Sequence, residues 1–159
     1  MCIRDSYDAL WKGLQKNIFS VIGSDHAPHT KEEKDKGYPQ SPSGMPGVQT
    51  LLPIMLQHVY KGSLSLEKLC ELICENPAKL FKLKTKGQVR ENFDADLTLV
   101  DFKKEYTIQN KDMASLCGWT PFHGMKVHGE VKMTIVNGKI VMRDGELVRC
   151  GQGKPIKTY

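Results

Sequence analysis

Hydrophobic residues recur at helical spacing through most of the first half of the chain. The pattern predicts a helix capped by Asp8, a largely buried helix over residues 48–60 and a third helix capped by Ser65. Pro77 suits the first position of a further short helix over residues 78–81, because that position needs no backbone N–H donor. The first half is therefore expected to be mainly helical.

After Gly87 the pattern changes to an alternation of apolar and polar residues. It predicts strands at residues 95–101, 106–108, 131–136 and 139–142. Asn137-Gly138 separates the last two strands and favours a type I′ hairpin turn. A small β unit is thus expected to follow the helical part.

One apolar stretch, residues 19–22, is too short for a helix and is expected to form a buried parallel strand. A polar cluster follows it directly, with the sequence Gly23-Ser24-Asp25-His26-Ala27-Pro28-His29. A helix followed by such a strand is typical of α/β folds, in which catalytic residues lie in loops after the carboxyl ends of strands. Spacing alone leaves two interpretations open, a metal or catalytic site and a loop of capping residues.

The charge pattern narrows the possible functions. The 159 residues carry a formal net charge of +5, but basic and acidic residues are interleaved, as in residues 31–36. Such mixing indicates a solvated surface and excludes a basic stripe for nucleic acid. No apolar run is long enough to span a membrane, so a soluble, cytoplasmic protein is expected. Residues 31–47 are rich in Pro and Gly, which is typical of lids, binding loops or disorder.

Cysteine and histidine positions add little evidence for a site. The five cysteines include no CxxC pair, which disfavours a disulfide framework or a closed zinc site. Cys70 and Cys74 lie one helical turn apart and are expected to pack in the core. Three further histidines are expected at the surface or the core edge rather than as ligands: His58, His123 and His128.

Six segments resemble, in the same order, the C-terminal part of dihydroorotases, which are cyclic-amide hydrolases of the amidohydrolase superfamily. They are residues 9–14 (ALWKGL), 23–29 (GSDHAPH), 42–47 (PSGMPG), 75–81 (ENPAKLF), 94–97 (DADL) and 118–122 (GWTPF). The second and third segments discriminate best, since the fourth and fifth are similar to segments of many amidohydrolases. Lys82 and Asn92 stand where the resemblance leads us to expect glycine.

The resemblance implies an enzyme that holds one or two metal ions, usually zinc, and reversibly opens the ring of dihydroorotate in pyrimidine synthesis. Asp25 would bind the metal and move a proton from the attacking water to the leaving nitrogen. His29 would hold the substrate carboxylate, and the main chain at Pro46 and Gly47 would contact the pyrimidine ring. Alternatively, His29 caps a loop turn and Pro46-Gly47 starts a helix. His26 is expected to have a structural role.

The implied fold class is α/β. Residues 7–86 would form the last part of a (β/α)8 metal-dependent hydrolase barrel, and residues 87–159 half of a composite β-sandwich. Residues 1–6 lack periodicity and are interpreted as a non-native leader or a truncation scar. The His-x-His pair and the other residues that complete the metal site in the family have no matching position here. We therefore expect a C-terminal fragment that is inactive alone.

Two other functions stay open. An allantoinase or dihydropyrimidinase would share Asp25 but would not need a histidine that holds a carboxylate. A catalytically inactive homologue would serve as a scaffold. The expected partner is a small-molecule substrate, and the full-length protein is expected to form a homo-oligomer or part of a pyrimidine-pathway complex.

Overall fold

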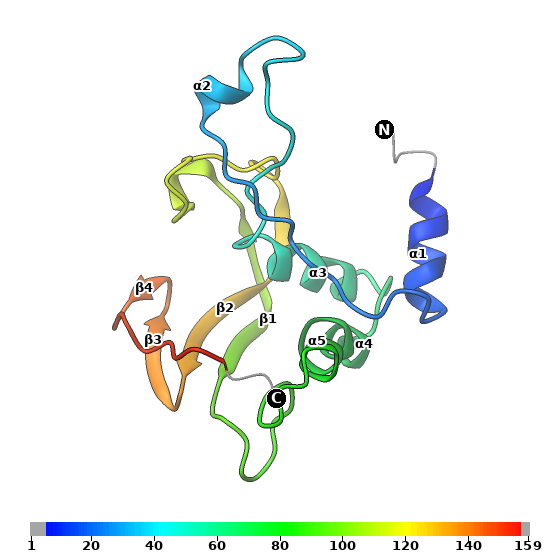
Figure 1. Ribbon diagram of the computed structural model, residues 1–159, viewed down its shortest axis with the longest axis vertical. Coiled ribbons are helices and arrows are strands. Elements are labelled where there is room, and N and C mark those ends of the chain that lie inside the picture. The colour runs from blue at the N-terminus through cyan, green and yellow to red at the C-terminus, as the bar shows by residue number, and fades with distance from the viewer. Residues whose placement is uncertain (1–5, 157–159) are drawn as a thin grey trace.

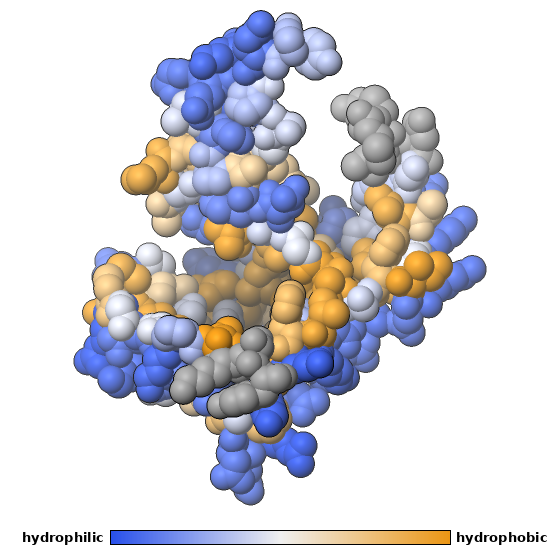
Figure 2. Space-filling model, viewed as in Figure 1, coloured by the Kyte–Doolittle hydropathy of each residue, from blue (hydrophilic) through white to orange (hydrophobic). Residues whose placement is uncertain are grey.

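The structure is a computed structural model that describes residues 6–156, so the expected leader at residues 1–6 lies, apart from Ser6, outside the described part. Figure 1 shows a group of helices beside an antiparallel sheet, with the loop that carries helix α2 projecting from them. In the space-filling view, polar side chains cover that projecting loop and apolar side chains gather between the helices and the sheet (Figure 2).

Most of the predicted helices are confirmed. The helices are α1 (Tyr7–Gln15), α2 (Lys31–Lys34), α3 (Leu51–Tyr60), α4 (Leu66–Cys70) and α5 (Asn76–Leu80), with a π-helical turn η2 (Glu71–Glu75) between the last two. Ser65 caps α4, because its side chain accepts the Lys68 N–H at 3.1 Å. The prediction for Asp8 was wrong: Ser6 occupies the N-cap position of α1, without a side-chain capping bond, and Asp8 lies in the first turn.

The β unit forms one antiparallel sheet of four strands in the order β1-β2-β3-β4. The strands are β1 (Leu97–Thr107), β2 (Lys126–Val136), β3 (Lys139–Arg143) and β4 (Glu146–Leu147), and a 3-10 turn η3 (Asn110–Asp112) follows β1. The predicted hairpin is confirmed, since Asn137 and Gly138 both have positive φ angles, 50° and 75°. Lys82 and Asn92, which stand where glycine was expected, also have positive φ angles, 56° and 66°.

The predicted strand at residues 19–22 was wrong. These residues form no regular element and pair with no strand of the described chain, so they lack the ladder that defines a strand. They dock on the helices instead: the Ile22 N–H donates to the Leu72 carbonyl at 3.2 Å, and the Asn76 side chain donates to the Ser20 carbonyl at 2.8 Å. The segment that leads to Asp25 is therefore anchored by η2 and α5.

Pro77 explains why the Leu72 carbonyl is available. The Asn76 N–H donates to the Glu71 carbonyl, one residue further back than in an α-helix. The next donor for the Leu72 carbonyl would be residue 77, and proline has no N–H. The Asn-Pro pair thus creates a π-helical turn whose spare carbonyl binds the Ile22 backbone.

The core lies between the helices and the sheet. Its buried members are Met55, Leu56, Leu64, Leu69 and Leu72. Helix α3 also contacts β2 closely, because a Cβ at Gly129 would lie 2.9 Å from the Leu56 Cβ. The predicted burial of Cys70 and Cys74 was wrong: both are exposed along a groove of about 930 Å³ beside β1. Partial burial nevertheless raises the pKa of both thiols, which favours their protonated form.

Candidate active site

A long loop, residues 23–50, builds the candidate site, and its two halves are joined at one point. The Ala27 N–H donates to the Met45 carbonyl at 2.9 Å, next to an isolated parallel pairing of His26 with Met45. Gly44 packs so closely against Ala27 that a Cβ at this position would lie 2.5 Å from the Ala27 Cβ. The segment around Asp25 and the segment around Gly47 are thereby held side by side.

Asp25 stands at the bend of this loop. Its φ angle is 44°, in the left-handed region that Asp tolerates better than most residues. Its side chain is exposed, and no hydrogen bond or ion pair with residues 6–156 involves its carboxylate. Both carboxylate oxygens are therefore available to a ligand.

His26 has the structural role that was expected. Its Nδ1 accepts two backbone N–H groups, from Gly47 at 3.1 Å and from Val48 at 3.3 Å. The Gly47 carbonyl accepts the Thr50 and Leu51 N–H groups, so both main-chain groups of Gly47 are used within the protein. A substrate that contacts the backbone here would have to share the N–H or the carbonyl of Gly47 with these partners. A Cβ at Gly47 would lie 2.7 Å from the Ser24 carbonyl oxygen, so the close approach that requires glycine here is made by the protein's own backbone.

His29 lies at the start of α2, where it is fixed by its main chain. Its N–H donates to the Ala27 carbonyl at 3.0 Å. Its imidazole Nδ1 is 3.7 Å from a carboxylate oxygen of Glu33, and 36% of the side chain is exposed. Thr30 and Glu33 form a capping box, and the Thr30 backbone N–H lowers the pKa of the Glu33 carboxyl. The backbone of His29 is thus fixed, and its imidazole remains accessible.

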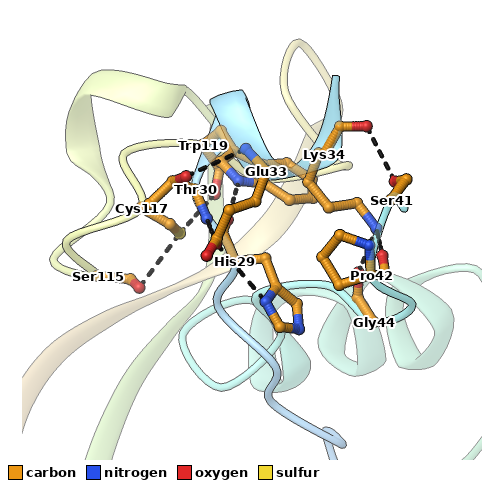
Figure 3. A network of polar contacts seen from close by, with 10 residues as sticks. All are labelled: His29, Thr30, Glu33, Lys34, Ser41, Pro42, Gly44, Ser115, Cys117 and Trp119. Atoms are coloured by element: carbon orange, nitrogen blue, oxygen red, sulfur yellow. Dashed lines mark hydrogen bonds and ion pairs between the residues drawn. The ribbon is translucent and has the colours of Figure 1, made fainter. Parts of the chain in front are cut away.

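Lys34 closes the part of the loop between α2 and Gly44. Its Nζ donates to the carbonyl of Pro42 at 2.6 Å and to that of Gly44 at 3.1 Å, and the Ser41 hydroxyl donates back to the Lys34 carbonyl. Figure 3 shows these contacts around His29 and Trp119. The loop is therefore ordered by its own polar groups, although it contributes no residue to the buried core.

Two residues of this site were missed from sequence. The indole Nε1 of Trp119 donates to the His29 carbonyl at 2.8 Å (Figure 3). Gln49 bonds the segment before Trp119 twice, since its side chain donates to the Asp112 carbonyl and accepts the Ala114 N–H, each at 2.8 Å. Trp119 belongs to the GWTPF segment, but nothing in its spacing indicated the partner, which lies 90 residues away.

A cavity of about 370 Å³ lies where these segments meet. One side is formed by His26, Pro46 and Gln49, and the other by Met113, Ala114 and Ser115. Pro46 and Gly47 are both buried, whereas Asp25 and His29 remain accessible. The structure therefore brings all the expected site residues into one loop system, with a cavity behind Pro46.

The other histidines do not line this cavity. His58 packs on Trp11, with ring centroids 4.3 Å apart, and burial lowers its pKa. His123 is exposed, as expected, and its Nδ1 accepts the Asn110 N–H. His128 is more buried than expected, because it stacks on Tyr60 and its backbone N–H donates to Gln57. All three have structural partners.

The described residues do not make a complete metal site. No three His, Cys, Asp or Glu side chains of residues 6–156 lie together in a way that would hold an ion. Asp25 nevertheless suits a hard or borderline metal ion, since it is an exposed carboxylate without a partner. Any metal ion bound by Asp25 would need further ligands from outside this part of the chain.

The comparison with protein families decides where this loop system belongs. The Amidohydrolase family matches residues 1–141 of the chain. The chain belongs to the amidohydrolase family. Members of this family hydrolyse cyclic amides among other substrates, and the family suggests a metal cofactor. Within the described residues, no helix is both long and apolar enough to cross a membrane.

Curated relatives of this amidohydrolase are named dihydroorotase. The protein from Pyrococcus furiosus is 42% identical over 148 residues, which are 93% of this chain and 34% of the relative. The protein from Pyrococcus abyssi is 43% identical over 97% of this chain and 37% of its own length. The multifunctional protein pyr1-3 of Dictyostelium discoideum is 38% identical over 91% of this chain and 6% of its own. The chain thus spans about a third of the Pyrococcus relatives.

Solved structures with the same fold are hydantoinases. L-hydantoinase (dihydropyrimidinase) from Arthrobacter aurescens has a TM-score of 0.83 and 38% identity, over 88% of this chain and 32% of that one. D-hydantoinase (dihydropyrimidinase) from Thermus sp. has a TM-score of 0.84 and 27% identity, over 89% and 32%. The helices and the antiparallel sheet are therefore an amidohydrolase arrangement.

Proposed function

We propose that this chain is the C-terminal part of a zinc-dependent dihydroorotase, which reversibly hydrolyses the cyclic amide of dihydroorotate to N-carbamoyl-aspartate in pyrimidine biosynthesis. One observation carries the proposal: an accessible carboxylate without a partner, Asp25, lies four residues before an accessible histidine, His29, in a chain about 40% identical to dihydroorotases. A cytoplasmic location and a homo-oligomer or pathway complex belong to the same proposal.

In this role Asp25 is a metal ligand and the general base. It takes a proton from the attacking water and delivers it to the ring nitrogen that leaves, so the proton count balances without another group. A bound zinc ion supplies the positive charge that lowers the pKa of the water and polarises the ring carbonyl. Acid–base catalysis by a positioned carboxylate contributes about 10²–10⁴-fold to such reactions.

His29, Pro46 and Gly47 bind the substrate in this proposal. His29 donates a hydrogen bond to the ring carboxylate, for which its accessible imidazole is suited. Pro46 and Gly47 form the wall of the ring site, where the backbone N–H of Gly47 would be shared with His26. His26 itself keeps the loop closed and does not contact the substrate.

We further propose that residues 7–86 form the last part of a (β/α)8 barrel and residues 87–159 the C-terminal strands of a composite β-sandwich. In the complete enzyme, residues 19–22 would pair with neighbouring barrel strands, which the described chain does not supply. The exposed apolar side chain of Leu99 on β1 supports the second part, because one sheet of a sandwich leaves an apolar face uncovered.

A hydantoinase or dihydropyrimidinase is the second candidate, and the solved structures with the same fold favour it. The test uses the complete enzyme, meaning the zinc-loaded polypeptide that has this chain as its C-terminal part. We expect the highest kcat/KM for dihydroorotate, compared with dihydrouracil, hydantoin and allantoin. A higher value for one of the substrates without a carboxylate would favour the second candidate. Zinc binding with no turnover of any of them would indicate a scaffold.

The chain of residues 1–159 by itself is expected to bind zinc weakly and to open no dihydroorotate. Large apolar side chains such as Leu66, Leu80 and Val89 are exposed, which favours aggregation. Metal titration and size-exclusion chromatography would check this. A monodisperse sample with measurable ring opening would contradict the proposal that this is only part of an enzyme.

A further inference from the structure

Trp119 lies between β1 and β2, in the β unit, yet its side chain bonds the loop that carries Asp25 and His29. We propose that Trp119 is a positioning residue for the substrate carboxylate and acts through the backbone of His29. This inference rests on the proposed dihydroorotase function, because it assigns to His29 the binding of that carboxylate.

The contact is direct and aimed at one group. The indole Nε1 donates to the His29 carbonyl at 2.8 Å, while the His29 N–H donates to the Ala27 carbonyl at 3.0 Å. Both main-chain groups of His29 are therefore fixed, one from its own loop and one from the β unit. Trp119 itself makes no contribution to the cavity wall. Its effect on a ligand would pass through His29.

The segment that presents Trp119 is itself held rigidly. The next residue, Thr120, is 4% exposed, and its N–H donates to the Asn110 side chain at 2.9 Å. The Cys117 thiol donates to the Trp119 carbonyl, and Gln49 holds the backbone of Asp112 and Ala114. A group that positions another is effective only when its own rotamer is fixed in this way. The backbone on both sides of Trp119 meets that condition, and the bond to His29 ties the indole itself.

The segment from Asp112 to Trp119 bonds the loop at both of its ends. One end lies near Pro46 and Gly47, and the other lies at His29. Gln49 follows the Pro46–Gly47 turn and bonds the beginning of the segment, whereas Trp119 at its end bonds His29. The β unit thus bonds both parts of the loop, in addition to the loop's own contact between Ala27 and Met45. Loss of the indole N–H should therefore weaken the grip on the substrate carboxylate more than it slows the chemical step.

The experiment compares Trp119→Phe with Trp11→Phe in the complete zinc-loaded enzyme. Trp11→Phe is a matched control, because Trp11 packs on His58 of α3 and lies outside the loop system. We expect Trp119→Phe to raise the KM for dihydroorotate about two- to tenfold, which is the worth of one net hydrogen bond, with a smaller change in kcat. Trp11→Phe should leave the KM unchanged.

A double-mutant cycle tests whether Trp119 acts through His29. In the His29→Ala background, Trp119→Phe should cause no further rise in KM, because the group it positions is absent. Additive effects would overturn the proposal. Loss of zinc or of the thermal transition in Trp119→Phe would also overturn it, because Trp119 would then be purely structural.

Gln49→Leu provides a second variant at the other end of the segment. It removes both contacts to Asp112 and Ala114 without touching Trp119. We expect it to raise the same KM with zinc content unchanged, and an unchanged KM in both variants would overturn the proposal. The proposed function is judged separately, since it fails only if the wild-type enzyme does not open dihydroorotate.

Discussion

Two aspartates of the chain, Asp25 and Asp96, differ in whether their carboxylates have partners. Asp25 lies in an irregular loop, is exposed and has no partner among the described residues. Asp96 precedes β1 and is fully engaged: it accepts the Asn137 N–H at 2.7 Å and pairs with Lys86. The neighbouring Asp94 accepts the Thr85 hydroxyl at 2.8 Å and also contacts Lys86.

This difference separates a carboxylate that stabilises the fold from one that is available for chemistry. Around Asp25 the main chain is well hydrogen-bonded through His26, Ala27 and Gly47, so the side chain is presented without being used. Around Asp96 the side chain itself closes the structure, joining residues 85–96 to the β2–β3 hairpin. A motif that contains an acid does not by itself indicate which of the two applies. The hydrogen-bond and ion-pair partners of the carboxylate show which of the two applies.

Asp25→Asn in the complete enzyme should have the largest effect on activity and almost none on stability. The amide keeps the shape but can neither shuttle a proton nor supply the charge of a metal ligand. We expect turnover to fall by several orders of magnitude, beyond the roughly 10²–10⁴-fold worth of acid–base catalysis alone. Asp35→Asn, another exposed acid of the same loop, is the control. Retention of more than about a tenth of wild-type activity would remove Asp25 from the mechanism.

His29→Ala should have the next largest effect and should fall mainly on binding. Loss of a charge-assisted hydrogen bond to the substrate carboxylate is worth about 1.5–3 kcal/mol, so the KM for dihydroorotate should rise roughly 10- to 100-fold. Zinc content, measured by atomic absorption, should not change. Loss of zinc would instead make His29 a ligand.

Gly47→Ala tests the main chain that presents both residues. The added Cβ would lie 2.7 Å from the Ser24 carbonyl oxygen, a backbone atom that cannot move without moving Asp25. We expect a loss of about 1–3 kcal/mol in the free energy of unfolding, with a fall in activity. Gly23→Ala is the matched control, because a Cβ there meets nothing within 4 Å. Equal stability of the two variants in denaturant titrations would contradict the predicted clash.

Local signals in the sequence predicted much of this architecture. The alternation after Gly87 and the Asn137-Gly138 turn gave the antiparallel sheet, because strand pairing there is between neighbours in sequence. The strand expected at residues 19–22 failed for the converse reason: its apolar pattern needs partner strands, and none lies in the described chain. Burial of Cys70 and Cys74 failed because periodicity shows which face is apolar but not what covers it.

Sequence predicted the proximity of site residues only where they lie in the same short segment. Asp25 and His29 share a segment, so their proximity followed from sequence. Trp119 contacts His29 across 90 residues, and Asn76 anchors Ser20 across 56, which no local pattern reveals. The capping box at Thr30 and Glu33 was a local signal that could have placed the start of α2.

Asp96→Asn is expected to have the smallest effect and to fall on stability rather than activity. The amide can still accept the Asn137 N–H but loses the charge that pairs with Lys86. Because 34% of the Asp96 side chain is exposed, we expect a loss of only about 1 kcal/mol in the free energy of unfolding at pH 7. Glu146→Gln, at an exposed acid of β4, is the control.

The pH dependence of the stability lost in Asp96→Asn is the sharpest test of the contrast between Asp25 and Asp96. The Asn137 N–H and the Lys86 ammonium hold the pKa of Asp96 below its usual value of 3.8. A lowered pKa in the folded state means that the stabilisation is fully present above pH 3.8 and is lost as the pH falls through the lowered pKa. The stability difference between wild type and Asp96→Asn, measured by urea titration at several pH values, should therefore shrink below that pH. A stability difference that does not shrink as the pH falls below 3.8 would contradict this origin of the stabilisation.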